Sequence, residues 1–481
     1  MTSGQRTPIL RWIRSSAPIP RGGMRVPILY RISRVLVRIC VNGYFRRLEI
    51  TGKQNIPTSG PVIFASNHPH SITDALLLGL GAGRMLHFIA HSGLFLSPFK
   101  AWFLRSNGVI PVYRPTDVEG APDKNAAMFA ACHQVLCDGG SIGIFPEGTS
   151  AQERRVQKLK TGTARIALSA EEASDWRLGL TIVPVGLNFE SRQRFRSRVL
   201  VRFGKPIKVA SLKNRYGEDE IATVNELTAA LQESLRNEVV NVERSEFDTL
   251  LRDVTKIYKG ELMERVDLVI PGQTSFEQDQ TMNREFARAL DYFYQRSPEV
   301  IWGLARQMEE YQSRRHALRL RDELLREAEG PSVRAEMVRF LMMGLFGLPP
   351  AVFGAIGNML PYELTARLAK RFARDLTKRH LFQFTVGLIL FAGWYGFLLM
   401  RVHSHLGGWR TFAVGLTLPP TGLFARQYAV RMQKRRAWLR FAWLEFQLGY
   451  QVRELRYLRG RLIADLDTAL AEYLQALRDQ S

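Results

Sequence analysis

The chain contains little cysteine. Its 481 residues include three, Cys40, Cys132 and Cys137, and their spacing is not that of metal-binding pairs. An odd number of scattered thiols argues against a disulfide framework. We therefore expect a catalytic domain that faces a reducing compartment, the cytosol.

Acidic residues are also scarce, with 45 Asp and Glu against 67 Lys and Arg and a formal net charge of +22. This excess alone would suit a nucleic-acid binder. Its distribution argues otherwise, because Arg31, Arg34 and Arg38 alternate with apolar residues between Val26 and Leu48. We expect residues 1–47 to be a basic amphipathic segment that lies in an anionic lipid interface or, alternatively, on its own domain. No nucleic-acid partner is expected, and the segment lacks the uninterrupted apolar core of a signal peptide.

A histidine and a carboxylate, His68 and Asp74, share one loop. The loop is predicted between a buried strand at residues 61–66 and an apolar helix that starts near residue 75. Such a turn is where α/β proteins place reactive groups. A histidine can take a proton from an alcohol and release it again, and a carboxylate can fix its tautomer. His70 lies four residues before Asp74 and remains a rival for the role of base.

Three later segments supply what an acyl transfer to a phosphorylated alcohol still needs. A β-rich run starts at Gly108 and ends on Arg114, whose guanidinium can bind phosphate through two hydrogen bonds. A strand at residues 141–144 leads into Phe145-Pro146-Glu147-Gly148-Thr149-Ser150, whose last residues offer N–H and hydroxyl donors. There, Glu147 can hold a substrate hydroxyl or orient a basic neighbour. Residues 182–186 form another short buried strand.

In this order the segments resemble the four blocks of the glycerolipid (PlsC-like) acyltransferase family, over roughly residues 30–250. The resemblance implies an α/β domain with a central mixed sheet flanked by helices. It makes His68 the catalytic base and Asp74 its orienting acid. It also implies that the second and third blocks, and a basic residue after them, bind the substrate: Gly108, Arg114, Phe145, Pro146, Glu147, Gly148, Thr149 and Lys160.

The resemblance departs from the family pattern at the His–Asp motif. Its commonest form has four residues between histidine and aspartate, whereas five separate His68 from Asp74. A subgroup that begins Asn-His-Pro-Asn accepts the longer spacing. This chain differs from that subgroup at His70 and Ala75, which replace an asparagine and a proline.

A narrower similarity extends through residues 189–209 and the helical and membrane regions that follow. It is to the yeast-type glycerol-3-phosphate/dihydroxyacetone-phosphate acyltransferases. The similarity implies transfer of a fatty acyl group from a thioester, acyl-CoA or acyl-carrier protein, to glycerol 3-phosphate, which gives lysophosphatidate in phospholipid synthesis. The alternatives are a lysophosphatidate or other lysolipid acceptor, and a non-catalytic membrane scaffold that binds lipid.

Neither a metal nor another cofactor is expected. His87 and His91 lie four residues apart and could be grouped with His68 and His70 as metal ligands. We interpret His87 and His91 instead as polar residues of a helix that faces the substrate.

The last third of the chain carries a membrane pattern. Residues 381–400 are long and apolar enough to cross a bilayer, and residues 409–425 form a shorter candidate span. Residues 338–360 are apolar but contain Pro349-Pro350, which suits a re-entrant or in-plane element, with a full span as the alternative. Basic residues flank the hairpin of spans on both sides, so both flanks and the catalytic domain should face the cytoplasm. The expected membrane is the cytoplasmic membrane of a bacterium or the endoplasmic reticulum of a eukaryote.

These patterns predict five regions in chain order. The N-terminal segment is followed by the acyltransferase domain at residues 48–245 and a helical region at 246–335. The membrane region covers residues 336–425. Basic helices occupy residues 426–481.

Overall fold

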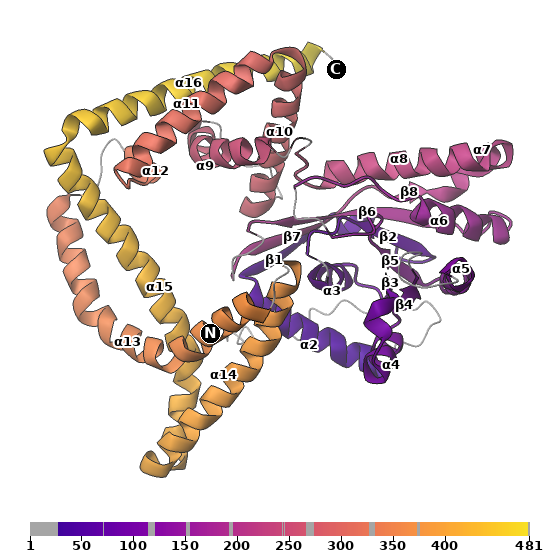
Figure 1. The fold of residues 1–481 in the computed structure, drawn as a ribbon, viewed down its shortest axis with the longest axis horizontal. Helices are drawn as coiled ribbons and strands as arrows, with labels where there is room; N and C mark the ends of the chain where they lie inside the picture. The colour runs from indigo at the N-terminus through magenta and orange to yellow at the C-terminus, as the bar shows by residue number, and fades with distance from the viewer. Residues whose placement is uncertain are drawn as a thin grey trace, which may run out of the picture. The chain divides into compact units, whose positions relative to one another are not determined.

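The computed structural model describes residues 27–70, 72–113, 121–150, 154–191, 196–242, 244, 246–265, 274–326, 332–372 and 376–479 (Figure 1). The chain forms two compact units. The first comprises Met1–Asn241 and Thr274–Thr281, and the second comprises Val242–Gln273 and Met282–Ser481. All three cysteines are free.

The first unit is built on one mixed sheet of eight strands. Along the main path the strand order is β1-β7-β6-β2-β5-β3-β4, and β8 pairs with β6. Strand β6 runs antiparallel to β7 and β8, and the other pairs are parallel. This confirms the mixed sheet. The strands are β1 Arg47–Thr51, β2 Val62–Ser66, β3 Leu86–His91, β4 Ile110–Val112, β5 Ser141–Ile144, β6 Thr181–Phe189, β7 Arg198–Phe203 and β8 Ile207–Lys208.

Helices cover both faces of this sheet, which explains why central strands such as β2 are buried at every position. On one face α5, α6 and α8 pack through Leu136, Ala167 and Leu227. On the other face α2 and α3 pack through Val41 and Leu77. The helical elements are α2 Ile28–Tyr44, η1 Lys53–Asn55, α3 Ile72–Gly81, η2 Ser92–Phe95, α4 Pro98–Ser106, α5 Ala121–Cys137, α6 Gly162–Ala173, η3 Val209–Leu212, α7 Lys213–Glu218 and α8 Glu220–Glu238.

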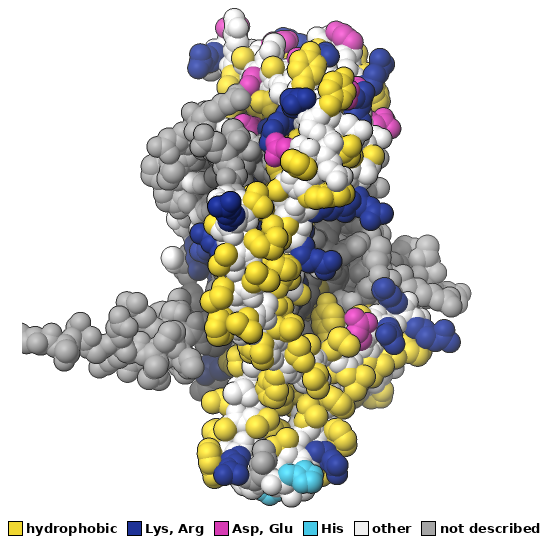
Figure 2. All heavy atoms as spheres, turned by 90° about the vertical axis from the view of Figure 1, so that its left-hand side faces the viewer, with side chains coloured by type: hydrophobic (Ala, Val, Ile, Leu, Met, Phe, Trp, Pro, Cys, Tyr) yellow, Lys and Arg dark blue, Asp and Glu magenta, His cyan; other side chains and the backbone are white. Residues whose placement is uncertain are grey.

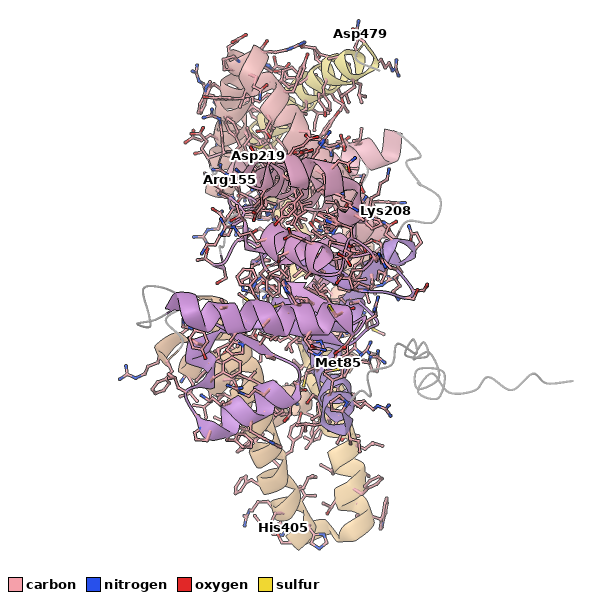
Figure 3. All side chains as sticks on the ribbon, turned by 90° about the vertical axis from the view of Figure 1, so that its right-hand side faces the viewer. Met85, Arg155, Lys208, Asp219, His405 and Asp479 are labelled. Atoms are coloured by element: carbon pink, nitrogen blue, oxygen red, sulfur yellow. The ribbon has the colours of Figure 1, made fainter. Side chains whose placement is uncertain are left out.

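Local signals set several of these boundaries. Strand β3 follows Met85, and β8 ends at Lys208 (Figure 3). Helix α8 begins after Asp219, also labelled in Figure 3, whose carboxylate accepts a hydrogen bond from the N–H of Ala222 at 2.9 Å. An aspartate at this position satisfies a backbone donor that the helix cannot pair.

The second unit is helical throughout its described residues. A buried ionic group joins its helices, because Arg459 of α16 pairs with both Asp322 of α12 and Glu261 of α9. The hydroxyl of Tyr311 donates to the same Asp322. The helices are α9 Phe247–Arg265, α10 Ser275–Arg296, which begins in the first unit, α11 Pro298–Ala317, α12 Asp322–Arg326, α13 Val333–Phe372, α14 Leu376–Leu406, α15 Gly408–Gln447 and α16 Gly449–Asp479.

The predicted membrane region corresponds to α13, α14 and α15. Among the described residues, two segments are long and apolar enough to cross a membrane by length and composition, α13 and residues Val386–His405 of α14. His405 lies at the turn into α15 (Figure 3). Figure 2 shows apolar side chains gathered along this part of the second unit.

The prolines in this region do not interrupt its helices. Helix α13 runs unbroken through Pro349 and Pro350, and α15 continues through Pro419 and Pro420 to Gln447. The predicted boundary at residue 426, between a span and a basic helix, therefore falls inside the continuous helix α15. Helix α13 packs against α15 along this region, and the four prolines themselves are exposed.

Glycine and an amide make that packing possible. A Cβ on Gly354 of α13 would collide with the carbonyl of Thr421 in α15. One turn later, Asn358 donates to the carbonyls of Gly354 at 2.8 Å and Leu418 at 3.0 Å. The hydroxyl of Tyr395 in α14 donates to the Asn358 side-chain oxygen at 2.5 Å. Small residues and satisfied polar groups of this kind are typical of helix contacts inside membranes.

Candidate active site

His68 and Asp74 lie together at the end of β2, as the sequence predicted. The Nδ1 atom of His68 is 3.0 Å from Oδ2 of Asp74, which occupies the first turn of α3. The carboxylate is fully buried, and the histidine side chain is 18% exposed. A buried carboxylate that accepts from Nδ1 leaves Nε2 as the ring nitrogen able to take a proton from a substrate.

His70 contacts the same carboxylate by its backbone. Its N–H donates to Oδ2 of Asp74 at 2.6 Å. Its ring is buried and lies edge-on to Phe189 of β6, with ring centres 4.5 Å apart. The geometry therefore favours His68 over His70 as the proton acceptor. It also shows how the loop accommodates the five-residue spacing.

Asn67 fixes the start of the loop. Its Oδ1 accepts from the N–H of Leu187 at 2.8 Å, and its Nδ2 donates to the carbonyl of Leu187 at 3.2 Å. Parallel pairing of β2 with β6 reaches Ser66 opposite Val185, so the Asn67 side chain continues it by one step. Sequence reasoning assigned no role to Asn67. The sequence did contain a signal for this role, because Asn67 is a polar amide placed between a buried strand and a histidine.

Aromatic rings hold His68 from its face. The ring of Phe145, directly after β5, stacks on His68 with centres 4.0 Å apart and planes 18° apart. Phe88 of β3 lies parallel to Phe145 at 6.3 Å. Gly143 leaves room for this stack, because a Cβ there would lie 2.5 Å from the Phe88 ring. Rings from the residue after β5 and from within β3 therefore stack in sequence on His68.

A basic side chain lies over the turn that follows Phe145. Gly148 has a φ of +71°, and a Cβ on it would be 2.8 Å from Nζ of Lys160. The N–H of Lys160 donates to the carbonyl of Pro146 at 2.9 Å. Glu147 is buried beside them, whereas Thr149 is exposed. A cation above a glycine turn is a suitable place for a phosphate.

The remaining predicted residues are less closely tied to His68. Gly108 has a φ of +77°, and a Cβ there would lie 2.8 Å from the His87 ring. Arg114 lies outside the described residues, so its predicted phosphate contact stays a prediction. His87 and His91 belong to β3, so the predicted helix is wrong at these positions. Within the described parts of the chain, no three His, Cys, Asp or Glu side chains gather as a metal site requires.

His87 is a titratable group of β3, in the part of the strand that pairs with β5, and not on the predicted helix. Its Nδ1 lies 3.4 Å from the carbonyl of Ser141 in β5. Burial lowers the pKa of His87, and the contact with the Ser141 backbone opposes this in part. The ring is therefore favoured in its neutral form.

Comparison with known proteins agrees with this geometry. Residues 47–188 match the family described as Acyltransferase. Over 144 residues the chain is 29% identical to the chloroplastic 1-acyl-sn-glycerol-3-phosphate acyltransferase LPAT1 of Arabidopsis thaliana, an alignment that covers 30% of this chain and 36% of the relative. Over 260 residues it is 27% identical to glycerol-3-phosphate O-acyltransferase 1 of Saccharomyces cerevisiae, covering 52% of this chain and 32% of the relative. The chain thus matches about a third of the length of either relative.

Among solved structures, the chain is similar to the 1-acyl-sn-glycerophosphate acyltransferase PlsC of Thermotoga maritima. The identity is 20% with a TM-score of 0.31, over 42% of this chain and 78% of that one. The matched residues, 47–188, contain His68, Asp74 and the turn at Gly148. Over residues 47–188 the chain therefore matches the Acyltransferase family, and both relatives named above are glycerolipid acyltransferases.

Proposed function

We propose that the chain is a membrane-bound glycerol-3-phosphate O-acyltransferase. It would move a fatty acyl group from acyl-CoA or acyl-carrier protein to a hydroxyl of glycerol 3-phosphate, which gives lysophosphatidate. The observation that carries the proposal is the His68–Asp74 pair. The His68 ring stacks on Phe145, and the turn at Gly148, which Lys160 covers, follows Phe145 directly. The pair and the turn support a role for His68 as proton acceptor and for Lys160 as the cation that binds the substrate phosphate.

The reaction needs no covalent enzyme intermediate. Asp74 holds Nδ1 of His68, and Nε2 removes the proton from the acceptor hydroxyl as its oxygen attacks the thioester carbonyl. The tetrahedral intermediate collapses with cleavage of the carbon–sulfur bond. The departing thiolate takes the proton from the imidazolium, and His68 returns to its starting state. Asp74 stabilises the imidazolium in between.

Substrate position depends on the phosphate. Lys160 and the backbone of the Gly148 turn are proposed to hold it, together with Arg114. Glu147, buried beside the turn, is proposed to orient the basic group or a substrate hydroxyl. Fixing the phosphate places the hydroxyl near the base and lowers the entropic part of the barrier.

The choice of glycerol 3-phosphate as acceptor is supported by the greater length of the alignment with the yeast glycerol-3-phosphate enzyme. The match to the yeast glycerol-3-phosphate enzyme extends over 260 residues, whereas that to the lysophosphatidate enzyme covers 144. The second candidate acceptor is lysophosphatidate. A site built from a base and a cation that binds phosphate suits both molecules.

A comparison of acceptors tests the proposal. The purified full chain in detergent would be given one acyl-CoA and either glycerol 3-phosphate or lysophosphatidate, and thiol release would be followed. We expect a higher kcat/KM for glycerol 3-phosphate. A preference for lysophosphatidate would reassign the acceptor, and lipid binding without thioester consumption would favour a scaffold over an enzyme.

Membrane attachment is part of the proposal and is supported by exposed apolar surface. In the first unit, α2 packs on its own domain through Val37 and Val41 and keeps a second apolar stripe exposed. Helix α2 thus packs on its own domain, as one alternative for the N-terminal segment required, and its exposed stripe supports the other alternative, a lipid interface. The stripe consists of Ile28, Ile32, Val35, Leu36 and Ile39. With Arg31 beside it, α2 suits an anionic lipid interface.

The second unit supplies the proposed spans. Because α13 is continuous, a re-entrant path would require a turn that this helix lacks, which leaves an in-plane helix or a span. The catalytic domain is proposed to face the cytoplasm, on a bacterial cytoplasmic membrane or the endoplasmic reticulum. Labelling of a cysteine placed at Gly357 distinguishes the two paths, since far-side access requires a span.

A further inference from the structure

The segment from Ser92 to Ser106 leaves its apolar side chains outside the fold. It comprises η2 and α4 and leads from β3 to the parallel neighbour β4. A crossover helix normally buries an apolar stripe against its sheet. Here neither η2 nor α4 has a buried residue. The apolar residues of this segment therefore contribute little to the core.

Those side chains form one apolar surface, which we call the α4 surface. Leu96 is 87% exposed and Phe99 is 71% exposed. Phe99 and Trp102 lie against each other with ring centres 5.9 Å apart, and the Arg105 guanidinium lies over the Phe95 ring. The exposed members are Leu94, Leu96, Phe99, Trp102 and Phe103.

The charges of this segment have one sign. Lys100 and Arg105 are exposed, and residues 92–106 contain no aspartate or glutamate. Leucine with tryptophan and phenylalanine, bordered by basic residues, is the composition that suits a bilayer interface. The positive charge favours anionic headgroups, which attract each nearby basic residue.

The α4 surface starts at the edge of the sheet where β2, β5 and β3 end, which we call the His68 edge. β3 and β2 both run parallel to β5, so the carboxyl ends of all three point the same way. His68 follows β2, Phe145 follows β5, and Ser92 begins directly after β3. The ring of Phe88, within β3, stacks on Phe145.

We propose that the α4 surface inserts into an anionic membrane interface and holds the His68 edge of the domain against the lipid. This contact is additional to α2 and to the helices of the second unit. It rests on the proposed function only in identifying the His68 edge as catalytic. An acyl thioester dissolved in the bilayer, or a lipid product, would then exchange beside the site without crossing water.

Photo-crosslinking tests the insertion directly. The full chain would be reconstituted in nanodiscs of phosphatidylglycerol, with p-benzoylphenylalanine at Leu96 or Phe99. Ile221 of α8 is the matched control, because it lies in the same unit and is 74% exposed. After irradiation, we expect several-fold more lipid adducts at 96 and 99 than at 221. Equal yields, or crosslinks to a second copy of the chain in place of lipid, would overturn the proposal.

Lipid charge and turnover provide two further comparisons. Replacing phosphatidylglycerol by phosphatidylcholine should lower the adduct yield at Phe99, and an unchanged yield contradicts the preference for anionic lipid. Phe99→Ser should lower turnover several-fold in nanodiscs and leave turnover in detergent unchanged, whereas Ile221→Ser should change neither. Equal losses in nanodiscs and detergent would contradict a membrane role. The adducts are scored without turnover, so a failed insertion is distinguishable from a failed assignment of activity.

Discussion

Nδ1 of His68 lies 3.0 Å from Oδ2 of Asp74, although five residues separate them. The same oxygen accepts the backbone N–H of His70 at 2.6 Å. One buried carboxylate atom thus orients the ring and closes the loop that carries it. The longer spacing is compatible with the His–Asp geometry of a base and its orienting acid.

Removing the charge of Asp74 should abolish most turnover. Asp74→Asn keeps the size of the side chain but no longer stabilises an imidazolium, and such a change costs about four orders of magnitude in turnover in a comparable pair. Initial rates of thiol release in detergent measure the loss, and circular dichroism checks the fold. Turnover near that of the unchanged chain would show that Asp74 does not act through His68.

Phe145 should act through ring stacking. Phe145→Leu removes an aromatic contact of about 1 kcal/mol, so the His68 ring should be less well placed and kcat should fall about tenfold. Phe145→Tyr is the control because it keeps the stacked ring. A kcat that is equal in all three proteins, or a change confined to KM for glycerol 3-phosphate, contradicts this role.

Asn67 should hold the loop to β6. Asn67→Ala leaves the N–H and carbonyl of Leu187 without their partner, at a cost of about 1–3 kcal/mol for an unpaired buried group. Hydrogen exchange should therefore accelerate in a peptide that covers Leu187, together with a loss of turnover. Asn67→Asp can still accept from the Leu187 N–H and should give an intermediate exchange rate. Unchanged exchange in the alanine variant would exclude this positioning role.

Gly148 should matter because Lys160 lies over it. Gly148→Ala puts a Cβ 2.8 Å from Nζ of Lys160 and should raise KM for glycerol 3-phosphate by displacing the ammonium. Gly139→Ala is the matched control. It also has a φ of +71° but has no atom within 4 Å of the added Cβ, so it should cost about 1–2 kcal/mol of stability and leave KM unchanged. Equal effects of both substitutions on KM would remove Lys160 from phosphate binding.

His87 should make stability depend on pH. Burial lowers its pKa from the ordinary 6.5, so the unfolded chain binds this proton at a higher pH than the folded one does. The His87 contribution is fully present above 6.5 and is lost as pH falls through the lower pKa of the folded state. Thermal unfolding between about pH 8 and pH 5 should show less of this decline in His87→Gln. Identical pH dependence in both proteins would refute the assignment.

Much of the fold could be predicted because local patterns agree with it. The apolar runs at residues 61–66 and 141–144 are β2 and β5, and the helical spacing near residue 75 is α3. The order of the motifs was sufficient to predict that His68, Asp74 and Phe145 share a site. Nothing local distinguished strand from helix between His87 and His91. There, pairing with β5 and the fit of Phe88 over Gly143 decide the structure.

Two further features were not predicted from the sequence, the role of Asn67 and the continuity of α13. Asn67 acquires its role from Leu187, 120 residues away in sequence. Pro349 and Pro350 predicted a break, but α13 is continuous through them and packs against α15. The local sequence around Asn67 does not identify Leu187 as its partner, and the sequence around Pro349 does not identify α15.

Substitution of His68 tests the central claim most directly. Turnover of acyl-CoA with glycerol 3-phosphate would be measured for purified His68→Gln and His70→Gln, with the fold of each checked by circular dichroism. We expect His68→Gln to lose at least about three orders of magnitude in kcat. His70→Gln should keep most of the activity, since the backbone N–H of residue 70 can still donate to Asp74. A folded His68→Gln protein with full activity, beside an inactive His70→Gln protein, would contradict the account.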